Sequence, residues 1–185
     1  MAGLRDSWDA ALTYERFVAE SEQHRGLWEG IYRLMRVPEW AFQAVPPGTR
    51  RRLLVIAEDW CGDASSTIPI VARFADAVPG MELRLVRRDQ YPGLMDRYLT
   101  NGSRSIPIII VLDESFRELG RWGPRPAELQ AWVLENRPQI PKADLYPQVR
   151  KWYARDRGET TLREVLAVAG LGPTAAEVGR TGGTT

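Results

Sequence analysis

The chain has 185 residues and a formal net charge of +1, with acidic and basic side chains interspersed. This length suits one well-packed domain but not two ordinary domains with separate cores. The balanced charge gives no electrostatic reason to expect a nucleic acid or an anionic membrane as partner. The longest apolar stretch, residues 106–112, is far shorter than the roughly 20 residues that a membrane helix needs.

The sequence contains a single cysteine, Cys61, and a single histidine, His24. One cysteine excludes a disulfide framework within the chain, and the N-terminus lacks the apolar segment of a signal peptide. We therefore expect a cytoplasmic protein. One Cys and one His are also too few soft ligands for a zinc or iron–sulfur site, so no metal is expected, although a metal bridging two copies stays open.

The spacing of apolar residues predicts helices at both ends of the chain and an alternating region between them. Residues 7–36 suit one or two amphipathic helices, and a connector with a short helical piece around Trp40 follows. From residue 51 the pattern predicts strands at 53–56, 82–87, 107–112 and 117–122, and helices at 64–78, 92–99 and 126–135. This alternation indicates an α/β fold, in which helices flank a central mixed sheet.

We divide the chain into an N-terminal helical extension (1–50), a core (51–137), a C-terminal helical extension (138–171) and a tail (172–185). Prolines 138, 141 and 147 punctuate a connector at the start of the C-terminal extension, and two helices, at 146–155 and 160–169, should follow. The Gly- and Thr-rich tail is predicted to be disordered. The N-terminal helices either pack against the sheet or form a docking surface.

Chemistry is expected at Cys61, which lies between the first core strand and the helix that follows it. A thiol just ahead of a helix faces unpaired backbone N–H groups and the positive end of the helix dipole, which favour the thiolate. Three carboxylates, Glu58, Asp59 and Asp63, oppose this effect, because like charge disfavours the thiolate. The sequence leaves the direction of the net pKa shift open.

The sequence Trp-Cys-Gly-Asp-Ala at residues 60–64 resembles the thioredoxin active site, where Trp-Cys-Gly-x-Cys joins the first core strand to a long helix. A second family feature, a cis-proline that faces the cysteine from the start of a later strand, is matched by Ser-Ile-Pro at residues 105–107. Over residues 51–137 the chain is thus similar to the thioredoxin-like family, in a bacterial single-cysteine variant. The resemblance implies a thioredoxin-like fold with extra N-terminal and C-terminal helices.

The resemblance further implies that Cys61 is the nucleophile and that the surface around it binds the substrate through Trp60, Gly62, Ile106 and Pro107. An extended peptide could pair with the backbone of Ile106 as an added strand. Two departures from the family pattern bear on the chemistry: Ala64 replaces the resolving cysteine, and Val55 replaces a buried acid. Turnover would therefore be monothiol, with glutathione, a related small thiol or a protein cysteine as the resolving group.

Four further side chains are candidates for modulating the thiol, namely Asp59, Asp63, Ser65 and Arg104. Ser65 could donate a hydrogen bond to the thiolate from the first helical turn, or could serve only to cap the helix. Arg104 could offset the carboxylates, with a surface salt bridge as its alternative role.

Three functions are compatible with these residues. The first is monothiol exchange on a protein disulfide or mixed disulfide, with a small thiol such as glutathione as co-substrate and no other cofactor. The second is a non-catalytic module that binds a protein partner. The third is redox sensing through an intermolecular Cys61–Cys61 disulfide. We rank exchange slightly first, because a discarded site has no need to keep its nucleophile.

Overall fold

The computed structural model of the protein describes residues 3–172. Its centre is a five-stranded mixed sheet in the order β1-β3-β2-β4-β5. The strands are β1 (Leu12–Thr13), β2 (Arg51–Ala57), β3 (Met81–Arg87), β4 (Ile108–Leu112) and β5 (Glu118–Trp122). Strand β2 runs parallel to β3 and antiparallel to β4, so the chain leaves the middle of the sheet just before Cys61. The predicted α/β fold with a mixed sheet is confirmed.

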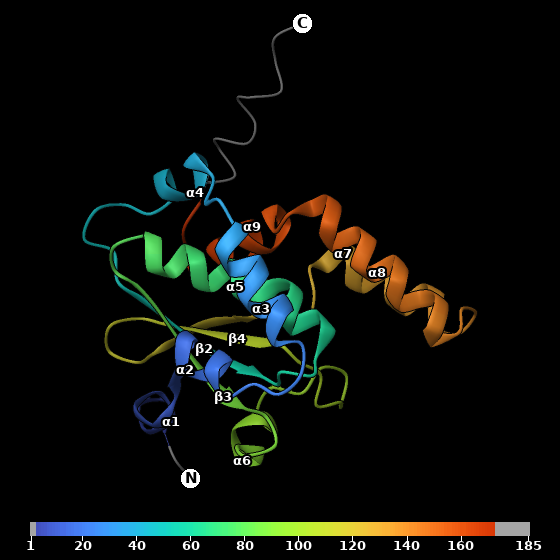
Figure 1. The fold of residues 1–185 in the computed structure, drawn as a ribbon. Coiled ribbons are helices and arrows are strands. Elements are labelled where there is room, and N and C mark those ends of the chain that lie inside the picture. The colour runs from blue at the N-terminus through green and yellow to red at the C-terminus, as the bar shows by residue number, and fades with distance from the viewer. Residues whose placement is uncertain (1–2, 173–185) are drawn as a thin grey trace, which may run out of the picture.

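Helices cover both faces of this sheet. They are α1 (Leu4–Ala10), α2 (Tyr14–Ala19), α3 (Arg25–Leu34), α4 (Glu39–Gln43), α5 (Gly62–Ala77), α6 (Pro92–Met95), α7 (Ala127–Asn136), α8 (Lys142–Asp156) and α9 (Glu159–Val168). Figure 1 shows α3, α5 and α9 above the sheet and α1 and α6 below it. Within residues 3–172, no helix is both long enough and apolar enough to cross a membrane.

The two central strands show why the sequence forms this sheet. All five residues of β4 are buried, as are residues 53–57 of β2. Continuous apolar runs of this kind are typical of strands that are covered on both faces. The resemblance places a buried acid at position 55. The residue there is Val55, which has no exposed surface and packs in the core. Strands β4 and β5 form the predicted hairpin.

The N-terminal region differs from its prediction. In place of the one or two helices expected at 7–36, it forms α1, α2 and α3 and a two-residue strand, β1, which pairs antiparallel with β3 through Leu12 and Thr13. A strand of two residues is too short to display the alternating pattern by which strands are recognised. Helices α2 and α3 are part of the main core, since Phe17 of α2 and Trp28 of α3 are fully buried in it.

Two other helix predictions need correction. The helix expected at 92–99 ends at Met95, and Tyr98 instead donates a hydrogen bond to Glu118 at 2.7 Å. Helix α8 begins at Lys142, earlier than expected, and contains Pro147, which we had assigned to a connector. A proline removes one helical hydrogen bond, but the apolar side chains on both sides of it continue to pack. The tail predicted to be disordered lies outside the described residues from residue 173 onward.

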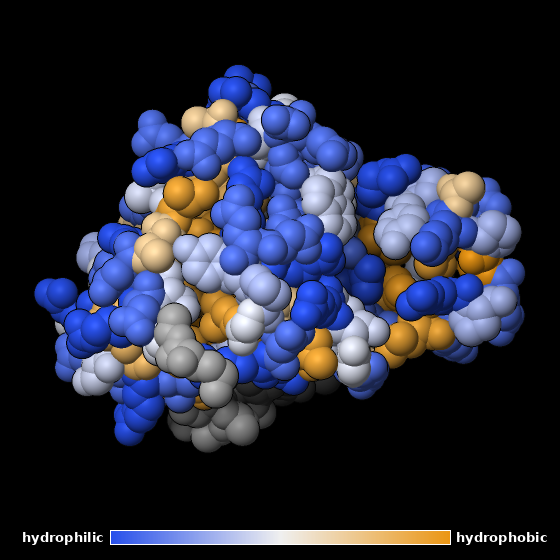
Figure 2. All heavy atoms as spheres, turned by 90° about the horizontal axis from the view of Figure 1, so that it is seen from below, coloured by the Kyte–Doolittle hydropathy of each residue, from blue (hydrophilic) through white to orange (hydrophobic). Residues whose placement is uncertain are grey.

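Helices α7 and α8 form a lobe beside the sheet layers, which we call the α7–α8 lobe (residues 127–156). Its buried side chains make a separate apolar cluster of Leu129, Val133, Leu145, Val149 and Tyr153. The lobe projects to the right in Figure 1. Figure 2, seen from below, shows hydrophobic residues along its junction with the body.

Candidate functional site

Cys61 is the N-cap residue of α5, at the corner where the chain leaves β2. Its sulfur accepts a hydrogen bond from the Ala64 backbone N–H at 3.5 Å and donates one to the Ile106 carbonyl at 3.5 Å. The residue is 8% exposed. The thiol is therefore held between the first turn of a helix and the loop that precedes β4.

The pKa of the Cys61 thiol lies above its ordinary value. Burial is the largest cause, and the negative charge of Asp63 adds to it, whereas the Ala64 N–H and the charge of Arg125 act in the lowering direction. The question that the sequence left open is thus answered in favour of the neutral thiol. The helix N-terminus does not overcome the loss of solvent around the sulfur.

Beside the thiol lies a buried polar cluster that the sequence did not predict. The Arg125 guanidinium contacts both oxygens of Asp63, with Nη2–Oδ2 at 2.6 Å and Nε–Oδ1 at 2.9 Å. The Tyr153 hydroxyl donates a third hydrogen bond to Asp63 Oδ1 at 2.9 Å. Arg125 comes from the loop before α7 and Tyr153 from α8. The carboxylate next to the cysteine therefore ties the α7–α8 lobe to the corner that carries Cys61.

The other two acidic residues near the thiol face different partners. Asp59 accepts hydrogen bonds from the backbone N–H groups of Glu22 and Gln23, at 2.7 and 3.1 Å. Although burial acts to raise the pKa of Asp59, these N–H groups and Arg87 hold it below its ordinary value. Glu58 accepts a hydrogen bond from the Asp89 N–H. Asp59 thus anchors the N-terminal region to the cysteine loop.

The loop across from Cys61 contains Ile106 and Pro107, joined by a cis peptide bond. Ile106 is buried, and its carbonyl faces the thiol. Trp60 is 39% exposed, and the Arg88 guanidinium lies 4.8 Å from the centre of its ring. Gly62 begins α5 with open space where a side chain would stand.

Two of the proposed modulating residues do not act on the sulfur directly. The Ser65 hydroxyl donates to the Gly62 carbonyl at 3.1 Å, so it takes neither of the two roles considered for it, the hydrogen bond to the thiolate or the helix cap. Arg104 forms a salt bridge with Asp96 at 2.7 Å, which is the alternative role considered for it. Asp63 does lie beside the thiol, but Arg125 offsets its charge.

A groove of about 320 Å³ opens above Cys61. One wall consists of Trp60 and the loop of residues 100–106, and the other is the α7–α8 lobe, including Val133, Leu134 and Tyr146. Five basic residues, Arg88, Arg104, Arg125, Arg137 and Lys142, and one acidic residue, Asp63, are among the described residues that line it. Three of these basic residues are already paired, Arg88 with Asp89, Arg104 with Asp96 and Arg125 with Asp63. The positive charge that the described residues leave unpaired in the groove therefore comes from Arg137 and Lys142.

No three His, Cys, Asp or Glu side chains within residues 3–172 gather in a way that could hold a metal ion. Arg125, which offsets the charge of Asp63, and Tyr153, which donates a hydrogen bond to it, lie far from Cys61 in the sequence. The only local signal was an arginine between two prolines at residues 124–126, which by itself indicates a rigid turn.

The mixed sheet, the thiol at the start of α5 and the cis-proline opposite define a thioredoxin-type fold. The family model described as thioredoxin matches residues 11–144, and the chain belongs to that family. A crystal structure of a protein of unknown function from Pseudomonas aeruginosa is similar, with a TM-score of 0.75 and 22% identity, covering 92% of this chain and 98% of the other.

An HIV epitope scaffold is also similar, with a TM-score of 0.72 and 21% identity, covering 91% of this chain and 98% of the other. At such identities the likeness concerns the fold alone. No curated protein matches the chain.

Proposed function

We propose that the protein carries out monothiol thiol–disulfide exchange, with Cys61 as the nucleophile and an external thiol as the resolving group. The observation that supports this most is the position of the Cys61 sulfur at the floor of the groove, between the Ala64 N–H and the Ile106 carbonyl. The N–H stabilises negative charge on the sulfur once the proton leaves. A disulfide that enters the groove reaches this sulfur.

The chemistry has two steps. The thiol gives its proton to water, and the Cys61 thiolate attacks one sulfur of a disulfide RS–SR′. A Cys61–SR bond forms, the S–S bond of the substrate breaks, and R′S⁻ leaves with the bonding electron pair. An external thiolate R″S⁻ then attacks the R sulfur, which yields RS–SR″ and returns the Cys61 thiolate. This route needs no cysteine at position 64.

The charge of the groove supports a substrate that carries carboxylates. Arg137 and Lys142 make no ion pair within the described part of the chain, and the one acidic lining residue, Asp63, is already paired. Glutathione or an equivalent small thiol is thus the proposed co-substrate, and a protein disulfide or mixed disulfide the proposed substrate. Exchange with a reduced small thiol suits the cytoplasm, where we propose that the protein works.

Four residues would form the contact surface for the substrate. Trp60 lines the groove next to the thiol, and the Ile106 carbonyl faces the sulfur from the other side. Gly62 and Pro107 adjoin these residues in the chain. An extended peptide would add along the Ile106 backbone. Arg88 would keep the Trp60 ring in place at the mouth of the groove.

The test is the reaction of the protein with oxidised glutathione, followed by intact mass. We expect a single glutathione adduct on Cys61, its release by reduced glutathione, and no adduct in Cys61→Ser. Lys142→Glu should slow adduct formation by about tenfold through loss of charge attraction, whereas Glu128→Lys, an exposed change outside the groove, should not. A rate no higher than that of an unstructured cysteine peptide at equal thiolate fraction would reject the proposal.

The raised pKa of Cys61 favours a second candidate, a non-catalytic module that binds a protein partner in the same groove. The replacement of the family's second cysteine and buried acid by Ala64 and Val55 points the same way. Cys61→Ser separates the candidates, because a binding module keeps its cellular function in that variant. Loss of function with partner binding intact would reject the module. Redox sensing has no comparable support, because a Cys61–Cys61 disulfide would need both buried sulfurs to meet.

A further inference from the structure

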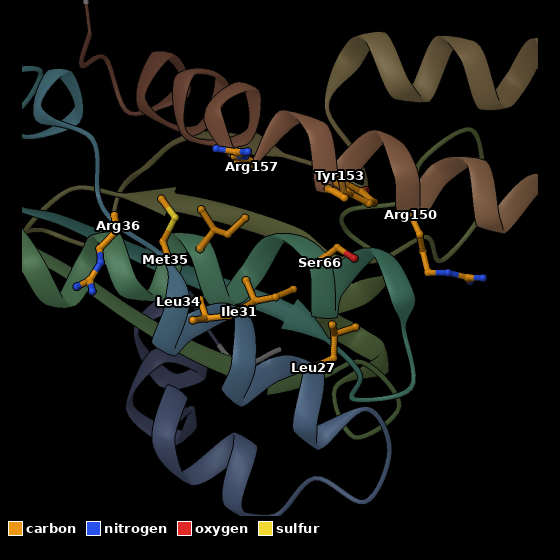
Figure 3. A pocket seen from close by; sticks show the side chains of 11 residues that line it. Leu27, Ile31, Leu34, Met35, Arg36, Ser66, Arg150, Tyr153 and Arg157 are labelled. Atoms are coloured by element: carbon orange, nitrogen blue, oxygen red, sulfur yellow. The ribbon is translucent and has the colours of Figure 1, made fainter.

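A second groove, of about 690 Å³, lies between α3, α5 and α8. Its volume falls within the range of about 300–1,000 Å³ that is common for small-molecule pockets. Figure 3 shows Leu27, Ile31 and Leu34 of α3 on one side and Tyr153 of α8 on the other, with Ser66 of α5 between them. This groove plays no part in the proposed exchange reaction.

The floor of the groove is apolar. Ile31, Met35 and Ile70 line it, and its two hydroxyl groups already have internal partners. The Ser66 hydroxyl donates to the Gly62 carbonyl at 2.7 Å, and the Tyr153 hydroxyl donates to Asp63 at 2.9 Å. A ligand therefore meets carbon rather than free hydrogen-bonding groups along the floor.

The rim carries positive charge. Arg36, Arg150 and Arg157 are exposed, and none of them makes an ion pair within residues 3–172. Figure 3 places Arg36 and Arg157 toward one end of the groove and Arg150 at the other. Two acidic residues line the adjoining hollow: Glu159 pairs with Arg163, whereas Asp156 accepts a hydrogen bond from the Thr160 N–H and keeps its charge.

Two leucines at the mouth are unusually exposed for their size. Leu34 is 73% exposed and Leu27 is 41% exposed. A second copy of the chain is unsuited to bury these leucines. Docking through the same face of both copies would bring the positively charged arginines of the two rims together, and they would repel each other. A ligand with an apolar chain and a negative end satisfies both the leucines and the arginines.

We propose that this groove binds a free medium-chain fatty carboxylate. The alkyl chain lies along Ile31, Met35 and Ile70, under Leu27 and Leu34. The carboxylate lies toward the end of the groove that carries Arg36 and Arg157, where their positive charge attracts it and a guanidinium group provides the charge-assisted hydrogen bonds that carboxylates accept.

Calorimetric titration of the whole chain with hexanoate, octanoate and decanoate, below their micelle concentrations, tests the proposal. We expect binding to tighten by up to about fourfold for each methylene buried. Octan-1-ol, which has the same chain as octanoate but no charge, should bind at least tenfold more weakly. Equal binding of octanoate and octan-1-ol, or no dependence on chain length, would overturn the proposal.

Matched variants locate the site. Leu34→Asp and Arg36→Glu should each weaken decanoate binding at least tenfold. Leu119→Asp, at a leucine on β5 that is 37% exposed, and Arg33→Glu, on α3 but outside the groove, should leave it unchanged. Equal effects in lining and control variants, or a dimer that Leu34→Asp dissociates, would contradict the proposal. Cys61→Ser should bind decanoate normally, so failure here leaves the exchange proposal unaffected.

Discussion

The two walls of the cysteine groove are held in different ways. The sheet wall, with Cys61 and the Ile106–Pro107 loop, rests on the central strands, whose apolar residues are fully buried. The lobe wall, α7 and α8, rests on a small apolar cluster and on the contacts of Arg125 and Tyr153 with Asp63. The position of the thiol thus depends on the core, whereas its local charge depends on the attachment of the lobe.

Removing the charge of Asp63 should break this arrangement most severely. Asp63→Asn leaves Arg125 buried without its counter-charge, and breaking a buried ion pair costs about 3–5 kcal/mol in the free energy of unfolding. The same change removes a negative charge that raises the pKa of Cys61. We therefore expect a less stable protein with faster alkylation of Cys61 at pH 7.5, measured by urea unfolding and by iodoacetamide kinetics.

The control for Asp63→Asn is Asp96→Asn, which removes the partner of Arg104 in an exposed salt bridge. Neither the urea midpoint nor the alkylation rate should change measurably, because exposed ion pairs contribute little. Slower alkylation in Asp63→Asn would contradict the role assigned to its charge.

Substitutions that create a cavity in one wall or the other should affect stability and amide exchange differently. Ile109→Ala in β4 should lower the free energy of unfolding by about 2–5 kcal/mol and speed amide exchange throughout the protein. Leu145→Ala should lower the free energy of unfolding by about 2 kcal/mol, at the lower end of that range. It should speed amide exchange mainly within residues 127–156. Hydrogen exchange by mass spectrometry distinguishes the patterns. Uniform exchange in Leu145→Ala would mean that the lobe unfolds only with the core.

A smaller effect is expected for Tyr153→Phe, which removes one hydrogen bond to Asp63 and keeps the ion pair with Arg125. A hydrogen bond to a charged group contributes about 1.5–3 kcal/mol to the free energy of unfolding. The pH profile of Cys61 alkylation should move less than in Asp63→Asn. Tyr32→Phe, which removes a hydrogen bond to Asp76 on the surface, serves as control and should leave the pH profile of alkylation unchanged.

The smallest effect concerns pH. Because burial raises the pKa of Cys61 in the folded protein, its contribution to stability is fully present below the pKa of the unfolded thiol, about 8.5. It is lost as the pH rises through the folded pKa. From pH 7 to pH 10 the wild type should therefore lose more stability than Cys61→Ser in urea unfolding. Parallel losses would show that Cys61 is not the titrating group.

The same two walls show what the sequence could predict. The strands β2 and β4 and the cysteine corner were predictable, because continuous apolar runs and the Trp-Cys-Gly motif are local signals. Strand β1 was not, since two residues carry no periodicity and their pairing with β3 depends on tertiary structure.

The lobe side of the site depended on distant residues. Asp63 was expected to repel the thiolate, but its partners Arg125 and Tyr153 could not be identified without the fold. Burial of Cys61 was equally hidden, because the Ile106 loop and the first turn of α5 enclose the sulfur only in the folded chain. The sequence therefore located the thiol but not the direction of its pKa shift.

The most direct test of exchange at Cys61 compares two reagents on folded and urea-unfolded protein at the same thiolate fraction. Iodoacetamide is small and uncharged, whereas oxidised glutathione is an anionic disulfide suited to a basic groove. We predict that folding slows iodoacetamide, because Cys61 is buried, but speeds the reaction with oxidised glutathione. If folding slows both reagents equally, the groove only shields the cysteine, and monothiol exchange is not its function.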